Sequence, residues 1–229
     1  MPRGTQTIET ERLVLRRFTL DDAEAMYNTW ATDPEVTRYM RWTPHKHLEE
    51  TRGVVRQWLA DYEKPDIYHW AITLKDSTPS ASGTPAASGT PAASGTPAAS
   101  GTPAASGTPA ASGTPAASGT LIGSLGILNQ PDTGCGREPG YCIGQAFWGK
   151  GYTTEALAAA LDYYIKDTGS TDLHCCHAAE NPASGRVMQK CGFVYDHDGS
   201  YTRYDGTTAE AKFYAYRPEN GAAGNKPKA

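Results

Sequence analysis

A glycine turn between a short apolar strand and an amphipathic segment is the strongest chemical signal in the chain. Residues 144–151 read Gly-Gln-Ala-Phe-Trp-Gly-Lys-Gly, and Tyr-Thr-Thr-Glu-Ala follows. Glycines let successive main-chain N–H groups turn toward one point, and the unpaired amides at a helix N-terminus bind phosphate. The stretch differs from a Walker A loop because Gly151 replaces the magnesium-binding Ser or Thr. The turn therefore predicts a site for a phosphate-containing ligand other than a magnesium nucleotide.

Three further motifs accompany this turn. Residues 10–16 read Thr-Glu-Arg-Leu-Val-Leu-Arg, residues 181–184 read Asn-Pro-Ala-Ser, and residues 190–193 read Lys-Cys-Gly-Phe. Together with the turn, their order and spacing resemble the GNAT superfamily of N-acetyltransferases. The N-terminal motif is similar to that of the RimJ/RimL-like branch, which acetylates ribosomal-protein N-termini and other amines. The resemblance covers nearly the whole chain once a repetitive segment at 78–119 is left out.

This resemblance implies acetyl-CoA as co-substrate and no metal. Main-chain N–H groups of residues 149–154 are expected to bind the pyrophosphate, while the strand before them separates from its neighbour and pairs with the pantetheine arm. Trp148 stands where many relatives carry Arg or Gln, so Lys150 is expected to supply part of the missing positive charge. The residues expected to bind the cofactor are Ile143, Gln145, Trp148, Gly149, Lys150, Gly151, Tyr152, Thr153, Thr154, Asn181 and Ser184.

Transfer of an acetyl group to an amine requires a base for the ammonium proton and an acid for the departing thiolate. Glu138 matches the position where many relatives place an acidic residue, and a solvated surface glutamate is the alternative. Met188 occupies the position of the tyrosine that many relatives use as acid. Ser184, three residues after Asn181, matches the serine proposed in the RimJ/RimL-like branch; an ordinary residue in the first turn of a helix is the alternative. A non-catalytic acyl-CoA-binding module therefore stays open as a second interpretation.

Other polar and aromatic residues carry weaker signals. The run His174-Cys175-Cys176-His177 resembles a zinc cluster, but alternate residues of a strand point to opposite faces and cannot all reach one ion. For His177 a core position is favoured. Two groups of side chains are candidates for the wall of the acceptor site, although solvated or packing roles are equally compatible with them: Arg38, Trp42, His45 and His47, and Tyr195, Tyr201 and Tyr204.

Composition limits the function classes. The net charge is −4, so the chain has no basic field that would favour nucleic acid or an anionic membrane. Neither a secretory signal nor an apolar run of about 18 residues is present, and the five cysteines form no C-x-x-C pair. These features predict a cytoplasmic protein, monomeric or homodimeric, with reduced thiols.

The elements that position these motifs alternate between strands and helices. An α+β fold is expected, with a mixed, mostly antiparallel twisted sheet flanked by helices. Thr154 is expected to cap the helix that follows the glycine turn, and Asn181 to cap the next helix, with Pro182 at its first position. A single N-acetyltransferase domain is expected over residues 1–77 and 120–217, followed by a flexible tail at 218–229.

A low-complexity insert interrupts this domain at residues 78–119. The unit Ala-Ser-Gly-Thr-Pro-Ala occurs six times between Ala81 and Ala116. Proline in every unit and the absence of large apolar residues predict a disordered segment. Strand-like runs precede and follow it, so the repeat is expected to lie in a β-hairpin loop. Expanding such a loop to roughly 44 residues adds only about 2 kcal/mol of closure entropy.

Overall fold

Five strands form the larger sheet of the protein. The computed structural model describes residues 2–75, 119–129 and 136–218. The sheet has the order β1 (Ile8–Glu9), β2 (Leu13–Arg16), β3 (Tyr68–Leu74), β4 (Leu121–Asn129) and β5 (Arg137–Ile143), and every neighbouring pair is antiparallel. Strands β3 and β4 pair from Tyr68 opposite Ile127 to Thr73 opposite Leu121. They are therefore the two arms of the hairpin expected on either side of the repeat, and the repeat itself lies almost wholly outside the described residues.

A second, three-stranded sheet holds the C-terminal part. Its order is β6 (His174–Ala178), β8 (Thr208–Tyr216) and β7 (Phe193–Thr202), again antiparallel. In the described part of the chain, β5 and β6 are joined only by one parallel bridge, between Arg137 and Leu173. Beyond this bridge β5 runs on without pairing to β6. The strand before the glycine turn thus separates from its neighbour, as expected.

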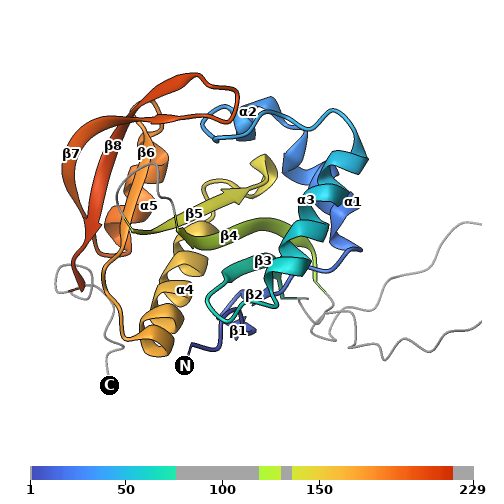
Figure 1. Ribbon diagram of the computed structural model, residues 1–229, viewed down its shortest axis with the longest axis horizontal. Helices are drawn as coiled ribbons and strands as arrows, with labels where there is room; N and C mark the ends of the chain where they lie inside the picture. Colours follow the sequence, from blue (N-terminus) through green and yellow to red (C-terminus); the bar gives the residue numbers. More distant parts are fainter. Residues whose placement is uncertain (1, 76–118, 130–135, 219–229) are drawn as a thin grey trace, which may run out of the picture. The chain divides into compact units, whose positions relative to one another are not determined.

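Helices cover both faces of the larger sheet (Figure 1). Before β3 the chain forms α1 (Asp22–Met26), the π-helical turn η1 (Tyr27–Ala31), α2 (Pro34–Thr37) and α3 (Leu48–Asp61). After β5 it forms the 3₁₀ turn η3 (Gln145–Phe147), α4 (Tyr152–Thr168) and α5 (Pro182–Lys190). One hydrophobic cluster joins the sheet to α4 and α5, and a second joins it to α1 and α3. The expected α+β architecture is confirmed.

Local sequence signals account for the helix starts. The Asp22 carboxylate accepts hydrogen bonds from the Thr19 main-chain N–H at 2.7 Å and from the Thr19 hydroxyl at 3.1 Å, at the entrance to α1. The Asn181 side chain accepts from the Ser184 N–H at 3.2 Å and caps α5, as predicted. The prediction that Thr154 caps α4 was wrong. The helix begins at Tyr152, because Gly151 takes a left-handed conformation (φ 81°) that turns the chain into the helix three residues earlier than a cap at Thr154 would.

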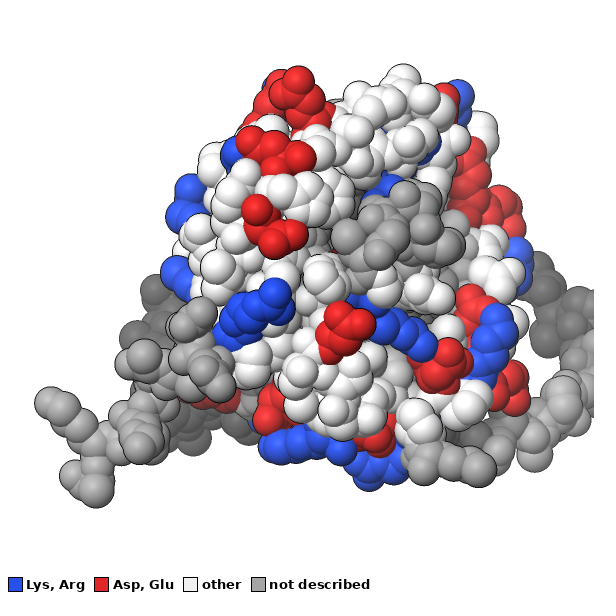
Figure 2. Space-filling model, turned by 60° about the vertical axis from the view of Figure 1, so that its left-hand side comes forward, with Lys and Arg blue, Asp and Glu red and all other residues white. Residues whose placement is uncertain are grey.

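The surface carries charges of both signs. On the face that Figure 2 shows, blue basic and red acidic side chains are interspersed among uncharged ones. Exposed ion pairs are common among the described residues, and Lys212 with Asp198 at 2.8 Å is one example. Across the described ranges, no helix combines the length and the apolar character needed to span a bilayer.

Candidate functional site

The glycine turn forms the start of helix α4. Gly149 and Gly151 both have positive φ, 75° and 81°, which L-residues with a side chain rarely adopt. The main-chain N–H groups in the first turn of a helix have no partner inside the helix, and the positive end of the helix dipole lies there. A 17-residue helix therefore directs unpaired donors toward the end of β5. This geometry suits a phosphate group.

Hydrogen bonds and an ion pair from the N-terminal motif, residues 10–16, hold the glycine turn in position. The Arg12 guanidinium donates to the Lys150 carbonyl at 3.0 Å, lies 4.6 Å from the centroid of the Tyr152 ring and pairs with Glu155 at 2.6 Å. The Glu155 carboxylate also accepts from the Thr10 hydroxyl at 2.6 Å. Residues far apart in sequence thus fix the turn before any ligand binds, which lowers the entropy cost of binding. The motif at residues 10–16 therefore has a structural role, because it fixes the conformation of the glycine turn.

The side chains of the turn itself point to main-chain acceptors. The Trp148 indole N–H donates to the Ile143 carbonyl at 2.8 Å, although the ring is 45% exposed. The Lys150 ammonium donates to the Ala146 carbonyl at 3.0 Å. One acceptor position of Ile143 is therefore already used, while the main-chain donors of the turn are not taken by these side chains. That main-chain N–H groups of the turn bind the phosphate stays a prediction.

A cavity of about 550 Å³ lies over β4 and β5 on the face opposite α4. Its walls come from α1, α3, the segment between α2 and α3, β6, the start of α5 and the β7–β8 hairpin. Both predicted catalytic residues, Glu138 and Ser184, line it, and so does Asn181. Strand β5 links the two parts of the site, because Glu138 lies near its beginning and the glycine turn follows its end. At about 3.4 Å per residue, Glu138 lies roughly 17 Å from the end of the strand at Ile143.

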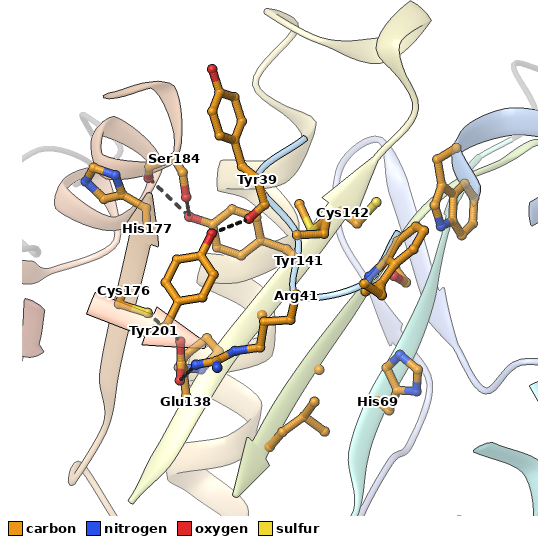
Figure 3. A pocket seen from close by; sticks show the side chains of 18 of the residues that line it. Tyr39, Arg41, His69, Glu138, Tyr141, Cys142, Cys176, His177, Ser184 and Tyr201 are labelled. Carbon is orange, nitrogen blue, oxygen red and sulfur yellow. Dashed lines mark hydrogen bonds and ion pairs between the residues drawn. The ribbon is translucent and has the colours of Figure 1, made fainter. Parts of the chain in front are cut away.

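Glu138 lies among polar partners inside the cavity (Figure 3). One carboxylate oxygen accepts from the Cys176 thiol at 3.2 Å, and the other lies 3.8 Å from the Arg41 guanidinium. The side chains of Glu138 and Arg41 are only 12% and 13% exposed. The alternative of a solvated surface glutamate is therefore wrong for Glu138. Glu138 thus faces a positive charge that is as shielded from solvent as the carboxylate itself.

Ser184 forms a pair with a phenol that the sequence does not reveal. The Tyr141 hydroxyl lies 2.8 Å from the Ser184 hydroxyl and 3.1 Å from its carbonyl. Burial raises the pKa of Tyr141 well above its usual value of 10, and the Ser184 hydrogen bond opposes this only in part. The phenol therefore keeps its proton at neutral pH. Two exchangeable protons lie next to each other at the edge where β5 separates from β6.

A roof closes the cavity between the segment before α3 and the β7–β8 hairpin. The Tyr201 hydroxyl donates to the Tyr39 carbonyl at 2.9 Å, and the Tyr204 N–H donates to the Arg41 carbonyl at 2.7 Å. The Arg41 guanidinium donates in turn to the Thr202 carbonyl at 3.1 Å. Of the predicted acceptor wall, Trp42, His45, Tyr201 and Tyr204 line the cavity, whereas Arg38, His47 and Tyr195 do not.

The run His174-Cys175-Cys176-His177 forms most of strand β6. Cys175 is buried and its thiol donates to the Pro139 carbonyl at 3.1 Å, while Cys176 turns to Glu138. His177 is buried, with Nδ1 2.7 Å from the Ala178 carbonyl and Nε2 3.3 Å from the Tyr214 hydroxyl. The favoured core position of His177 is confirmed, although the ring also borders the cavity. Among the described residues, no group of three or more His, Cys, Asp or Glu could hold a metal ion.

The comparisons with known proteins concern the family and the fold. A family profile described as an acetyltransferase (GNAT) domain matches residues 12–90 and 104–194, which is most of the chain. The chain belongs to the GNAT acetyltransferase family. It is 25% identical over 190 residues to the uncharacterized N-acetyltransferase p20 of Bacillus licheniformis, covering 82% of each chain. The resemblance inferred from the sequence motifs is thus confirmed, and the protein is an acyltransferase that uses acetyl-CoA for N-acetylation.

Two of the similar solved structures contain coenzyme A or acetyl-CoA. RimL, a ribosomal L7/L12 alpha-N-protein acetyltransferase solved with coenzyme A, has a TM-score of 0.64 at 15% identity and covers 94% of this chain and 99% of its own. The microcin C7 self-immunity acetyltransferase MccE, solved with acetyl-CoA and AMP, has a TM-score of 0.62 at 14% identity and covers 93% and 96%. These likenesses show the fold.

Sequence reasoning missed three residues of the site: Tyr141, Arg41 and Cys176. Tyr141 lies three positions after Glu138, and odd spacing in a strand places two side chains on opposite faces. Both line the same cavity, at the edge where β5 is paired with β4 but, among the described residues, has no partner on its other side beyond the Arg137–Leu173 bridge. Arg41 belongs to a loop without periodic pattern. For Cys176 the strand alternation did give a usable signal, since it predicts that Cys176 and Cys175 face opposite ways.

Proposed function

We propose that the chain acetylates a primary amine by direct transfer from acetyl-CoA, with Glu138 and the Ser184–Tyr141 pair handling the protons. The observation that carries the proposal is the presence of Glu138, Ser184 and Tyr141 around one cavity at the end of the separated strands. In this proposal the N–H groups of residues 149–154 bind the pyrophosphate. The pantetheine arm follows β5 between Ile143 and Asn181 toward the cavity.

In the proposed reaction Glu138 binds the acceptor as an ammonium ion and takes one of its protons. The amine lone pair then forms the C–N bond to the thioester carbonyl. The nitrogen of the tetrahedral intermediate loses its second proton to solvent as the intermediate collapses and the C–S bond breaks. The departing thiolate takes a proton from Ser184, which regains it from Tyr141 and finally from solvent. The overall change is one amide, one thiol and one released proton. Arg41 supports Glu138 by keeping it ionised until the ammonium arrives.

The Ser184–Tyr141 pair answers the objection raised by Met188. Met188 is buried and cannot donate a proton, which favours a binding module when the sequence is taken alone. The phenol of Tyr141 nevertheless lies 2.8 Å from the Ser184 hydroxyl and supplies a donor from a different element. This contact supports the catalytic interpretation over the module that only binds acyl-CoA.

The test is release of free thiol from acetyl-CoA in the presence of amines. A panel should include a small apolar amine, a polyamine and a short peptide with a free N-terminus. Turnover of at least one amine, with the acetylated product seen by mass spectrometry, is the expected result. Saturable acetyl-CoA binding without turnover of any amine would support the binding module instead.

Ser184→Ala should lower kcat about 10²-fold, at the low end of acid–base contributions, and leave the melting temperature nearly unchanged. Stability is expected to survive because Asn181 caps α5 through the main-chain N–H of residue 184, which alanine keeps. Tyr141→Phe should give a similar loss. The double variant should be little worse than either single one, since the two groups act as a unit. Ser200→Ala, on an exposed part of β7, is the control, and a wild-type rate for Ser184→Ala would remove Ser184 from the mechanism.

Removal of residues 80–117 should leave the acetyltransferase active. We infer that the domain consists of residues 1–77 and 120–217 and that the repeat is dispensable. The hairpin closes without it, because the Leu74 N–H donates to the Thr120 carbonyl at 2.9 Å. Shortening the loop should stabilise the fold by up to about 2 kcal/mol through closure entropy. A deletion variant that melts normally and yet lacks thiol release would show that the repeat contributes to function.

A further inference from the structure

Half of the cavity takes no part in the proposed proton transfers. Its walls are aromatic and thioether side chains from the segments that precede β3: Met26 and Trp30 from α1 and η1, Trp42 from the loop before α3, and Trp58 from α3. Trp30 and Met26 are almost fully buried, whereas Trp42 and Trp58 are partly exposed. Figure 3 shows the separation, with Glu138, Cys176 and Ser184 on one side of the cavity and His69 on the other.

The two imidazoles of the aromatic half are neutral at neutral pH, and Asp61 of α3 is its one charged lining residue among those described. Complete burial lowers the pKa of His69 to about 4, and its ring packs edge-on against Trp58 with the centroids 4.1 Å apart. Burial also lowers the pKa of His45, whose Nδ1 lies 2.7 Å from the buried Thr51 hydroxyl. The charged residues among the described lining are Arg41, Glu138 and Asp61, and Asp61 forms an ion pair with Lys64 at 2.7 Å. Negative charge for an ammonium is therefore concentrated at Glu138.

This division has a chemical consequence for the acceptor. A group that occupies the aromatic half loses its water and gains mainly dispersion and ring contacts. An apolar ring gains free energy there, whereas a second ammonium or a hydroxyl-rich group would lose its hydration without hydrogen-bond partners. Unpaired polar groups discriminate more strongly than missing apolar contacts. The wall thus selects against polyamines and aminosugars more than it selects among apolar groups.

The size and the roof of the cavity limit the acceptor further. A volume of about 550 Å³ lies within the range of small-molecule sites. The hydrogen bonds from Tyr201 to the Tyr39 carbonyl and from Arg41 to the Thr202 carbonyl join the two sides of the roof. A polypeptide would have to separate these contacts to extend out of the cavity on this side. A small molecule fits without breaking them.

Taking the proposed amine acetylation as its basis, we propose that the acceptor is a small primary amine carrying an aromatic ring. The ammonium group lies at Glu138, and the ring lies against Trp30, Trp42 and Trp58. The aromatic residues thus form the specificity-determining wall of the acceptor site.

The experiment compares 2-phenylethylamine with butylamine, spermidine and a serine-initiated tetrapeptide, by thiol release with saturating acetyl-CoA. We expect kcat/KM for 2-phenylethylamine to exceed that for each of the other acceptors by about 10-fold or more, the discrimination that apolar contacts supply. Quenching of tryptophan fluorescence by 2-phenylethylamine in the presence of coenzyme A gives a second measure that does not depend on turnover.

Trp42→Ala tests the wall, because Trp42 lies on a loop and contributes little to the buried core. It should remove most of the preference by raising KM for 2-phenylethylamine, with little change for butylamine. Trp42→Phe should restore part of it, and Tyr195→Ala, outside the cavity, should leave the preference unchanged. Equal or faster turnover of spermidine or the peptide would overturn the proposal while leaving amine acetylation intact. Failure of every amine to react or to quench fluorescence would remove the acetylation proposal and this inference with it.

Discussion

Replacing Glu138 with glutamine should lower kcat by about 10²-fold or more, the range expected when a general base is lost. Glutamine keeps the shape of the side chain but cannot take a proton from the ammonium. Acetyl-CoA binding should be unaffected, because the glycine turn lies at the other end of β5. The measurement is kcat from thiol release, with acetyl-CoA affinity from a thermal-shift titration.

The pH dependence separates a catalytic role from a structural one. Without the carboxylate, the variant depends on amine that has lost its proton in solution, so its rate should rise about tenfold per pH unit up to the pKa of the acceptor. The wild type should rise less steeply. Glu180→Gln is the matched control, because Glu180 also faces an arginine, Arg38 at 3.7 Å, but its side chain is 76% exposed. A Glu138→Gln variant with a wild-type rate would exclude Glu138 as the base.

Loss of the Arg41 contact could also affect the fold, and Glu138→Asp addresses this point. Aspartate keeps the charge that faces Arg41 but withdraws the carboxylate by one methylene. If the role of Glu138 is catalytic, Glu138→Asp should melt like the wild type and recover part of the rate. If Glu138 matters only through its ion pair with Arg41, each of the two variants should lose activity in proportion to the fall in its melting temperature.

Much of the fold could be predicted because its signals are local. Thr19 with Asp22, and Asn181 with Pro182, mark helix starts through hydrogen bonds within one turn. The hairpin arms β3 and β4 are recognisable on either side of the repeat because apolar strand patterns survive the insertion. The start of α4 was misplaced at Thr154, because a glycine in the left-handed conformation can begin a helix without a side-chain cap.

The candidate site could be predicted only where its parts lie within one motif. Glu138, Ser184 and the glycine turn each belong to a short pattern. The contacts that shape their chemistry join distant segments: Arg41 reaches Glu138 from a loop nearly a hundred positions earlier, and Tyr141 reaches Ser184 from another element. Such pairs depend on how β5 separates from β6 and on how the roof closes. The strand separation and the roof are both properties of the packed structure, so no local sequence pattern indicates them.

The separation of the five-stranded sheet from the three-stranded sheet is likewise a property of the packed structure. A sequence pattern can indicate strands β5 and β6 individually, but not that a single bridge, Arg137 with Leu173, joins them. Side chains on α5 fill the space that opens beyond it, with Tyr141 and Ser184 in contact across the opening. Tyr141, which belongs to the β4–β5 ladder, thus becomes part of the proposed chemistry through a residue of α5. This explains why the tyrosine missing at position 188 has a counterpart on a strand.

Gly151→Asp should weaken acetyl-CoA binding by at least about tenfold. An aspartate there would place negative charge at the N-terminus of α4, where the pyrophosphate is proposed to bind, and two negative groups would compete for the same main-chain donors. Folding alone should tolerate the charge, because an acidic residue at a helix N-terminus is favourable. Its backbone strain is of order 1–2 kcal/mol, the usual cost of a left-handed conformation for a residue with a side chain.

Two control variants divide strain from charge. Gly169 ends the same helix with nearly the same conformation, φ 72°, and a side chain there would meet no atom within 4 Å, so Gly169→Asp carries similar strain away from the cofactor. Gly151→Asn has the shape of aspartate without its charge, and asparagine tolerates the left-handed region better than most residues. We expect Gly169→Asp to bind acetyl-CoA like the wild type and Gly151→Asn to fall between. Equal loss in the Asp and Asn variants at 151 would assign the effect to shape rather than charge, and unchanged affinity in both would mean that the pyrophosphate binds elsewhere.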